Sequence, residues 1–142
     1  MQLTRHTDYA LRTLIQVALM PEGQKLSVAE ITRTYDLSRS HVMKIVQKLG
    51  HHGFLKNSRG KGGGIELGMN PESINIGSVV RLMEHSLKII DCDSPDCRLQ
   101  PACQLKGVLA EAMNAFFGVL EQYSLSDLLE NRHELIQLLS IE

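Results

Sequence analysis

The sequence predicts a mainly α-helical fold that contains one two-stranded β-hairpin. Three observations lead to this fold class: apolar residues recur at helical spacing in several segments, one pair of short segments alternates like strands, and a glycine-rich stretch joins that pair. The 142 residues, of which 43 % are hydrophobic and 22 % charged, are enough to bury a core and are typical of a globular protein.

The first two helices are bounded by clear local signals. Apolar residues at helical spacing predict a helix from Leu3 to Met20, and Pro21-Glu22-Gly23 ends it. Ser27 and Glu30 have the spacing of a capping box and open a second helix. A tight turn at residues 36–38 then predicts a sharp change of direction before the next helix.

The third helix begins after Ser38 or Ser40 and runs to about Leu49, before a break at residues 50–53. At about 100° per residue, its apolar positions fall on one inner side: Val42, Ile45, Val46 and Leu49. The opposite side is small, polar and basic, with two further residues on its flanks: Ser40, Met43, Lys44, Gln47 and His51, flanked by His41 and Lys48.

A β-hairpin is expected after the third helix. Residues 54–57 and 65–67 alternate like strands, and the loop between them carries Arg59 and Lys61 among four glycines. Glycine allows a close approach of the backbone to a phosphate. Helix, turn, helix and basic hairpin, in this order, form the arrangement of a winged helix-turn-helix DNA-binding domain with a two-stranded β wing.

The charge distribution agrees with this interpretation. Up to Gly64 the chain has ten Lys and Arg against four Asp and Glu (net +6), whereas from Ile65 onward it has five against twelve (net −7). A basic half joined to an acidic half is typical of a nucleic-acid-binding module attached to a second module. The alternative to nucleic-acid binding is an ordinary solvated surface whose charge imbalance arises by chance.

The expected contacts with double-stranded DNA come from the third helix and the hairpin tip. Residues at the start of such a helix reach base edges, while lysines and arginines meet phosphates or enter a narrow minor groove. The candidate DNA-binding residues are Ser38, Arg39, Ser40, His41, Lys44, Gln47, Lys48, Arg59 and Lys61.

The second half contains a cysteine loop between two helices. A fourth helix is expected from Ile76 to about Ile90, an irregular loop from Asp91 to Cys103, a long helix from Gln104 to about Tyr123, and a shorter helix from Ser124 to Leu139. We therefore divide the chain into a winged helix-turn-helix domain, residues 1–75, and a second region that contains the cysteine loop and the helices around it, residues 76–142.

All three cysteines lie in this loop: Cys92, Cys97 and Cys103. An odd number argues against a disulfide framework, and clustered thiols favour metal or redox chemistry. The spacing is not that of common structural zinc sites, whereas iron–sulfur clusters take cysteine thiolates. Three thiolates leave one ligand to come from this chain or from a partner subunit. Metal-free thiols and zinc remain alternatives.

The whole chain resembles the Rrf-type winged-helix iron–sulfur transcription regulators, specifically their nitric-oxide-sensing repressors. The resemblance rests on six segments: residues 1–4, 7–12, 38–44, 59–65, the three cysteines with Pro101-Ala102 before the last, and residues 123–128. It implies a homodimer whose interface is the long helix after the cysteine loop. It also implies that the cysteines and a non-cysteine ligand hold an iron–sulfur cluster, [2Fe-2S] or [4Fe-4S].

In the nitric-oxide-sensing subgroup, the fourth ligand is an aspartate of the first helix that reaches across from the partner subunit, and the matching residue here is Asp8. The alternative to a ligand role for Asp8 is that of an acidic residue in the first turn of the helix, where the helix dipole stabilises it. Regulators of cluster assembly instead use a histidine three residues after the third cysteine, where this chain has Lys106. This departure favours a nitric-oxide sensor over a cluster-assembly regulator.

The function that we expect is therefore a homodimeric repressor that binds two-fold related half-sites and senses nitric oxide through its cluster, controlling genes for nitric-oxide stress. The alternative within the family is a regulator of iron–sulfur or redox status, and an electron-transfer module is an alternative outside it. An enzyme is not expected, because no nucleophile, base and oxyanion site come together in the sequence. Without a signal peptide or spanning segment, we expect a cytoplasmic protein with no membrane partner.

Overall fold

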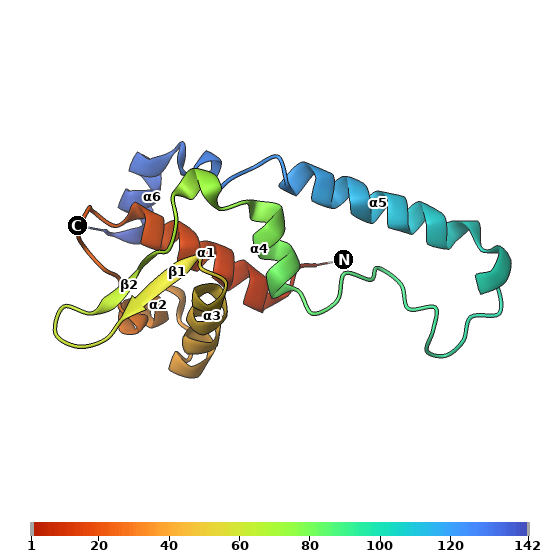
Figure 1. The fold of residues 1–142 in the computed structure, drawn as a ribbon, viewed down its shortest axis with the longest axis horizontal. Helices are drawn as coiled ribbons and strands as arrows, with labels where there is room; N and C mark the ends of the chain where they lie inside the picture. Colours follow the sequence, from red (N-terminus) through yellow and green to blue (C-terminus); the bar gives the residue numbers. More distant parts are fainter. Residues whose placement is uncertain (1, 142) are drawn as a thin grey trace.

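The computed structural model describes residues 2–141, in which one long helix projects as an arm from a body made of the other elements (Figure 1). The elements, in chain order, are α1 (Arg5–Leu19), α2 (Val28–Tyr35), α3 (Arg39–His51), β1 (Leu55–Ser58), β2 (Gly64–Leu67), the 3-10 turn η1 (Pro71–Ser73), α4 (Ile76–Met83), η2 (Gln100–Ala102), α5 (Gln104–Leu120), η3 (Asp127–Leu129) and α6 (Arg132–Leu139). The predicted mainly α-helical class with one two-stranded hairpin is confirmed.

The first two helices begin where side chains satisfy free N–H groups. Thr4 caps α1, because its Oγ1 accepts the N–H of Thr7 at 3.3 Å. At α2 the predicted capping box is present: the Glu30 N–H donates to Ser27 Oγ at 3.2 Å, and the Ser27 N–H donates to Glu30 Oε2 at 2.7 Å. These bonds from Ser27 hold the pKa of Glu30 below its ordinary value. Local sequence therefore sets both starts.

The periodicity of α3 is also confirmed, since the four inner residues predicted for it are all buried. The helix continues through Gly50 to His51, two residues beyond the predicted end. The Phe54 N–H then donates to the carbonyl of Leu49 at 3.0 Å, and the Gly53 N–H donates to that of Gly50 at the same distance. These two bonds close the helix end and direct the chain into the wing.

The wing is a short antiparallel pair that is attached to the body. Leu55 of β1 faces Leu67 of β2, and the register ends at the pair Ser58 and Gly64. The residue before α2's cap, Leu26, exchanges two backbone hydrogen bonds with Ile65, at 2.8 and 3.0 Å. Because Leu26 belongs to the α1–α2 connection, this bridge fixes the base of the wing relative to the helices.

The fourth helix is shorter than predicted, since α4 ends at Met83 and not at Ile90. The carboxylate of Glu84, the residue after it, accepts hydrogen bonds from the Thr4 N–H at 2.8 Å, from Thr4 Oγ1 at 3.1 Å and from Thr7 Oγ1 at 2.5 Å. Further on, residues 87–90 leave the helical path and lie along α5. Contacts with α1 and α5 therefore end α4 although its apolar periodicity continues.

The single helix predicted from Ser124 to Leu139 is wrong. The N–H and the hydroxyl of Ser124 both donate to Asp127 Oδ2 at 2.7 Å, which begins the short turn η3 and not a continuous helix. The last helix, α6, starts only at Arg132. The Arg132 guanidinium donates to the carbonyls of Ala18 and Leu19, each at 3.0 Å, so α6 is attached to the C-terminal end of α1.

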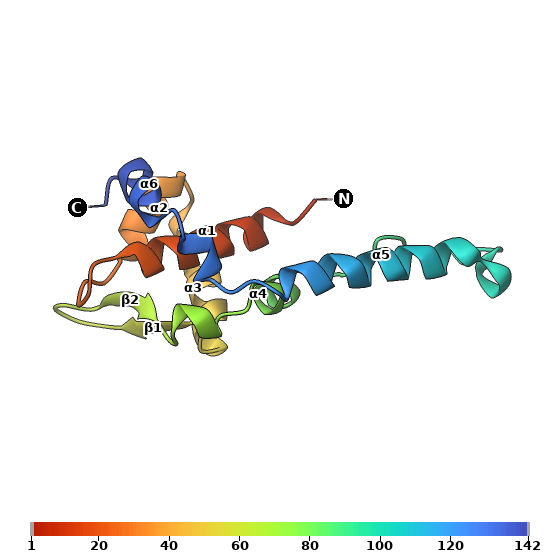
Figure 2. The same cartoon turned by 90° about the horizontal axis from the view of Figure 1, so that it is seen from above.

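The arm is α5, which joins the body through its C-terminal half. There Phe117 is buried, and the Arg81 guanidinium of α4 lies 3.8 Å from the centre of its ring and 2.9 Å from Glu121 Oε1. Asn75 Nδ2 also donates to the carbonyl of Glu121 at 2.8 Å. The other end of α5 projects away from the body in both views (Figures 1 and 2).

Candidate nucleic-acid interface and cysteine loop

The outer side of α3 is the polar surface that the sequence predicts. Its N-cap is Ser38, whose Oγ accepts the His41 N–H at 3.3 Å and lies 3.2 Å from Ser40 Oγ. Six residues of this helix start and outer side are mostly exposed: Ser38, Arg39, Ser40, Met43, Lys44 and Gln47. Because the opposite side of the helix is in the core, this polar side is held outward.

His41 has a packing role that sequence reasoning missed. Its ring is half-buried and stacks on that of His6 in α1, with ring centres 5.5 Å apart and His6 Nδ1 3.4 Å from His41 Nε2. The ring of Tyr9 meets His41 edge-on at 5.9 Å. The ring of His85, beyond α4, also stacks on that of His6, with ring centres 6.5 Å apart. The His41 ring therefore connects the start of α3 to α1.

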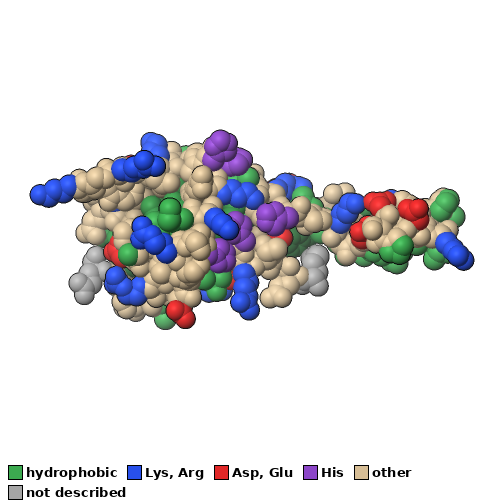
Figure 3. Space-filling model, turned by 90° about the horizontal axis from the view of Figure 1, so that it is seen from below, with side chains coloured by type: hydrophobic (Ala, Val, Ile, Leu, Met, Phe, Trp, Pro, Cys, Tyr) green, Lys and Arg blue, Asp and Glu red, His purple; other side chains and the backbone are tan. Residues whose placement is uncertain are grey.

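The potential near these histidines is positive. Partial burial lowers the pKa of His6, and the charges of His41, Lys48, His85 and Lys44 lower it further. Figure 3 shows that Lys, Arg and His side chains gather over this side of the body. Such a surface attracts an anionic partner.

The wing tip places Arg59 and Lys61 away from the body, and both residues are exposed. Gly60 and Gly62 between and beside them have positive φ angles of 94° and 82°. A Cβ on Gly63 would lie against the carbonyl oxygen of Ser58 and 2.9 Å from that of Gly60. The tight turn that presents the two basic side chains therefore requires the glycines that the sequence provides.

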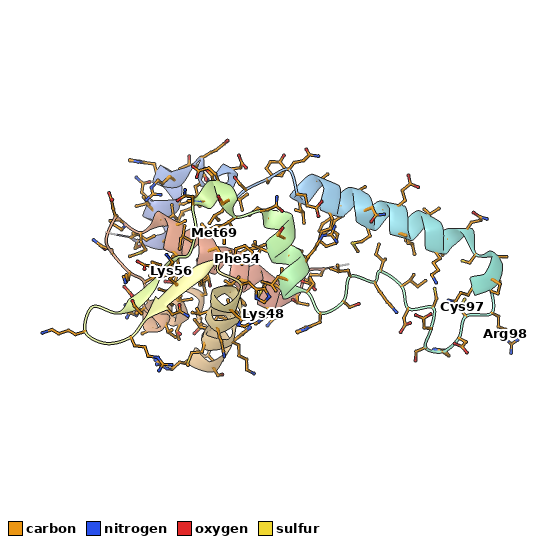
Figure 4. The ribbon with its side chains drawn as sticks, viewed as in Figure 1. Lys48, Phe54, Lys56, Met69, Cys97 and Arg98 are labelled. Atoms are coloured by element: carbon orange, nitrogen blue, oxygen red, sulfur yellow. The ribbon has the colours of Figure 1, made fainter. Side chains whose placement is uncertain are left out.

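Lys56 is a candidate contact that sequence reasoning missed. It is exposed on β1 and lies on the same side of the body as Lys48 of α3, while Phe54 and Met69 lie at the base of the wing (Figure 4). The excess of positive charge in the first half of the sequence was the available signal, but it did not distinguish Lys56 from the other basic residues. Lys56 lies on β1, the strand that leads from α3 to the basic wing tip.

The cysteine loop lies at the far end of the arm. Cys92 is buried, Cys97 and Cys103 are half-buried, and all three are free thiols. The Cys97 N–H donates to the Cys92 carbonyl at 3.0 Å, so the loop folds back on itself between these residues. Figure 4 places Cys97 and Arg98 at the end distant from α3.

The surroundings of the loop suit anionic sulfur ligands. Cys103 directly precedes α5, whose first turn has no acidic residue, so a thiolate there lies at the positive end of a helix dipole. Lys88 Nζ lies 2.9 Å from Asp93 Oδ2, and Gln100 Nε2 donates to Asp93 Oδ1 at 3.3 Å. These contacts tie the loop together around Asp93.

Within one chain, the predicted ligands do not form a complete metal site. Over residues 2–141, no three His, Cys, Asp or Glu side chains are arranged so that they could hold one metal ion. Asp8 is on α1 and pairs with Arg12, with Oδ1 2.8 Å from Nε. The structure of a single chain thus keeps Asp8 in the body and the three thiols on the arm.

Comparison with known proteins identifies the family. The model of the Rrf2 family, described as iron-dependent transcriptional regulators, matches residues 3–131. The chain belongs to the Rrf2 family. It is 43 % identical to the HTH-type transcriptional regulator NsrR of Bacillus subtilis and 44 % identical to NsrR of Halalkalibacterium halodurans; each match covers 100 % of this chain and 99 % of the relative.

Solved structures of the Rrf2 family agree with the fold. T. potens IscR superposes with a TM-score of 0.75 over 95 % of this chain and 90 % of that one, at 22 % identity. Together with the family match, this confirms the winged-helix architecture and the expectation of a DNA-binding transcription regulator and not an enzyme. None of the helices in the described part of the chain is long and apolar enough to cross a membrane.

Proposed function

We propose that this Rrf2 regulator is a homodimeric repressor that binds a two-fold operator and releases it when nitric oxide reaches an iron–sulfur cluster. The observation that carries the proposal is the arm: an exposed apolar helix that carries all three cysteines in the loop at its free end. Support for the signal comes from the resemblance to the nitric-oxide-sensing subgroup and from the full-length similarity to the NsrR regulators.

The dimer follows from the exposure of α5. Only Phe117 of this helix is buried in one chain, while Leu105, Val108 and Val119 are 55 %, 59 % and 54 % exposed. A helix this apolar is unfavourable in water along most of its length. A second copy of α5 would cover it, and a two-fold pair would use the same surface on both subunits.

The cluster ligands that we propose are Cys92, Cys97 and Cys103, with Asp8 of the partner subunit as the fourth. Cysteine thiolates are the usual ligands of iron–sulfur clusters, [2Fe-2S] or [4Fe-4S], and the three free thiols of this chain share one loop that ends at the start of α5. When bound, the cluster would supply iron that reacts with nitric oxide. The Asp8 side chain is half-buried and forms a surface ion pair with Arg12. Such a pair contributes little free energy, so exchanging it for a bond to iron would cost little.

The coupling that we propose runs through α1. This helix carries Asp8 and also His6 and Tyr9, whose rings contact His41 at the start of α3. A restraint on Asp8 is therefore a restraint on the helix that orients α3. In a dimer, two α3 helices must match half-sites about 34–36 Å apart, so a small rotation of α1 changes DNA affinity.

The DNA surface that we propose consists of the outer side of α3 and the wing. It includes the nine residues predicted from the sequence, Ser38, Arg39, Ser40, His41, Lys44, Gln47, Lys48, Arg59 and Lys61, together with Lys56. Eight of these ten residues are exposed, all except the partly buried His41 and Lys48, and six of the ten are lysines or arginines, which supports this surface. The α3 residues would face base edges and nearby phosphates, while the wing would follow the adjacent backbone or minor groove.

The test is an anaerobic preparation of the full chain, analysed for iron, sulfide and visible absorption, with DNA binding measured before and after nitric oxide and, separately, peroxide. We expect a coloured protein whose DNA affinity falls with nitric oxide. A colourless, zinc-containing protein would refute the cluster, and a response to peroxide alone would favour a sensor of redox status.

A variant pair tests the fourth ligand. Asp8→Ala should leave the DNA binding of the apo-protein unchanged, alter the absorption of the cluster and weaken the cluster-dependent change in affinity. Arg12→Ala is the matched control, because it breaks the same ion pair but keeps the carboxylate. If Asp8→Ala has the spectrum and the response of the unaltered protein, Asp8 is not a ligand.

A further inference from the structure

Met43 is an apolar side chain in an unusual place. It is 51 % exposed, and among residues 4–86 it is the one large hydrophobic side chain that the structure leaves mostly exposed. Single exposed apolar residues are common on protein surfaces. This one, however, lies in the middle of the polar side of α3, the surface proposed above to face DNA.

The helix geometry holds Met43 outward together with residues that suit DNA. Ser40 and Gln47 are three and four residues away along α3, so they share its side of the helix, and both are exposed, as is the adjacent Lys44. Val42 and Ile45, on either side of Met43 in sequence, are completely buried. The helix therefore cannot turn Met43 inward without exposing its core residues.

The neighbours of Met43 indicate the chemistry of its partner. A protein partner would be expected to meet a larger apolar patch, whereas here Met43 stands among Arg39, Ser40, Lys44 and Gln47. Hydroxyl, amide and basic groups suit the base edges and phosphates of DNA. In the major groove, the one apolar group on a base edge is the 5-methyl of thymine.

We propose that Met43 is a specificity-determining residue that packs against the 5-methyl group of a thymine in each half-site. The inference rests on the proposed placement of α3 in the major groove. The flexible, polarisable thioether side chain of methionine adapts well to such a small apolar target. Met43 would thus select thymine by an apolar contact and not by a hydrogen bond.

The experiment removes the methyl group without changing any hydrogen bond of the base. The anaerobic full chain first selects its preferred duplex from a random-sequence library. That duplex is then synthesised with each thymine replaced in turn by deoxyuridine. We expect one thymine in each half-site whose replacement weakens binding by about four-fold, the effect of losing one methyl-sized contact.

Met43→Ala completes the test. This variant should bind the thymine duplex about as weakly as the unaltered chain binds the deoxyuridine duplex, and it should bind its two forms equally. Leu138→Ala is the control, since it removes an 80 % exposed apolar side chain of α6, away from α3, and should behave like the unaltered chain.

Two results would overturn the inference, and they are distinguishable from failure of the proposed function. If a duplex is selected but no deoxyuridine replacement weakens binding, or if Met43→Ala remains as sensitive to the replacement as the unaltered chain, Met43 does not read thymine. If no sequence is enriched at all, selective DNA binding by α3 fails, and the role of Met43 fails with it.

Discussion

Glu84 is predicted to hold α1 and α4 together, and its removal should destabilise the folded chain. Its carboxylate accepts hydrogen bonds from the Thr4 N–H at 2.8 Å, from Thr4 Oγ1 at 3.1 Å and from Thr7 Oγ1 at 2.5 Å. The two bonds from Thr4 are exposed to solvent, whereas Thr7 is completely buried. The largest loss in a Glu84→Ala variant is therefore the bond from Thr7.

The expected cost follows from these three bonds. A hydrogen bond to a charged group contributes ~1.5–3 kcal/mol to stability. Because exposure to solvent weakens the bonds from Thr4 and keeps the total near the lower end of that range, Glu84→Ala should lower the free energy of unfolding by about 1–2 kcal/mol. Urea unfolding of the apo-protein, at matched protein concentration, measures this difference. Glu22→Ala, which removes an exposed carboxylate, is the control.

The effect should depend on pH in a defined direction. Partial burial raises the pKa of Glu84, but the hydrogen bonds from Thr7 and Thr4 outweigh it, and the pKa is lowered from its ordinary 4.5. A depressed carboxyl pKa stabilises the fold above the unfolded pKa, and this contribution disappears as pH falls through the folded pKa. The stability difference between the unaltered chain and Glu84→Ala should therefore be full at pH 7 and shrink below about pH 4.5. A difference that is absent at pH 7, or that grows in acid, would refute this account of Glu84.

Three further predictions concern the arm and the wing. Phe117→Ala should lower the free energy of unfolding by about 3–5 kcal/mol, because Phe117 is a buried aromatic residue where α5 joins the body. Phe116→Ala, at the neighbouring half-buried position, should lower it by less. Equal losses for the two variants in urea unfolding would contradict this prediction. Lys56→Ala should reduce the slope of log affinity against log salt by about 0.9, as loss of one phosphate contact requires, while Lys106→Ala on the arm should leave the slope unchanged. An unchanged slope for Lys56→Ala would exclude Lys56 from the DNA surface. Gly63→Ala should weaken DNA binding with little loss of helix content, since its Cβ would collide with the wing turn; retained affinity, measured beside circular dichroism, would show that the wing tip is not needed.

Local sequence determined much of the DNA-binding half. The starts of α1, α2 and α3 depend on capping side chains within three residues, such as Ser27 and Glu30, so they are visible in the sequence. The inner and outer sides of α3 follow from a period of 3.6 residues. The glycines of the wing tip likewise predict a turn, because they adopt backbone conformations that other residues rarely adopt.

The tertiary structure decided what depends on residues distant in the chain. The end of α4 at Met83 is set by hydrogen bonds between Glu84 and the distant residues Thr4 and Thr7. The packing of His41 is set by His6 of α1, so neither feature was predictable from local periodicity. The sequence by itself determined that three thiols share one loop and that α3 has a polar outer side. Only the fold showed that α5 carries those thiols away from the body, because the attachment of Phe117 to Arg81 joins segments that no local pattern connects.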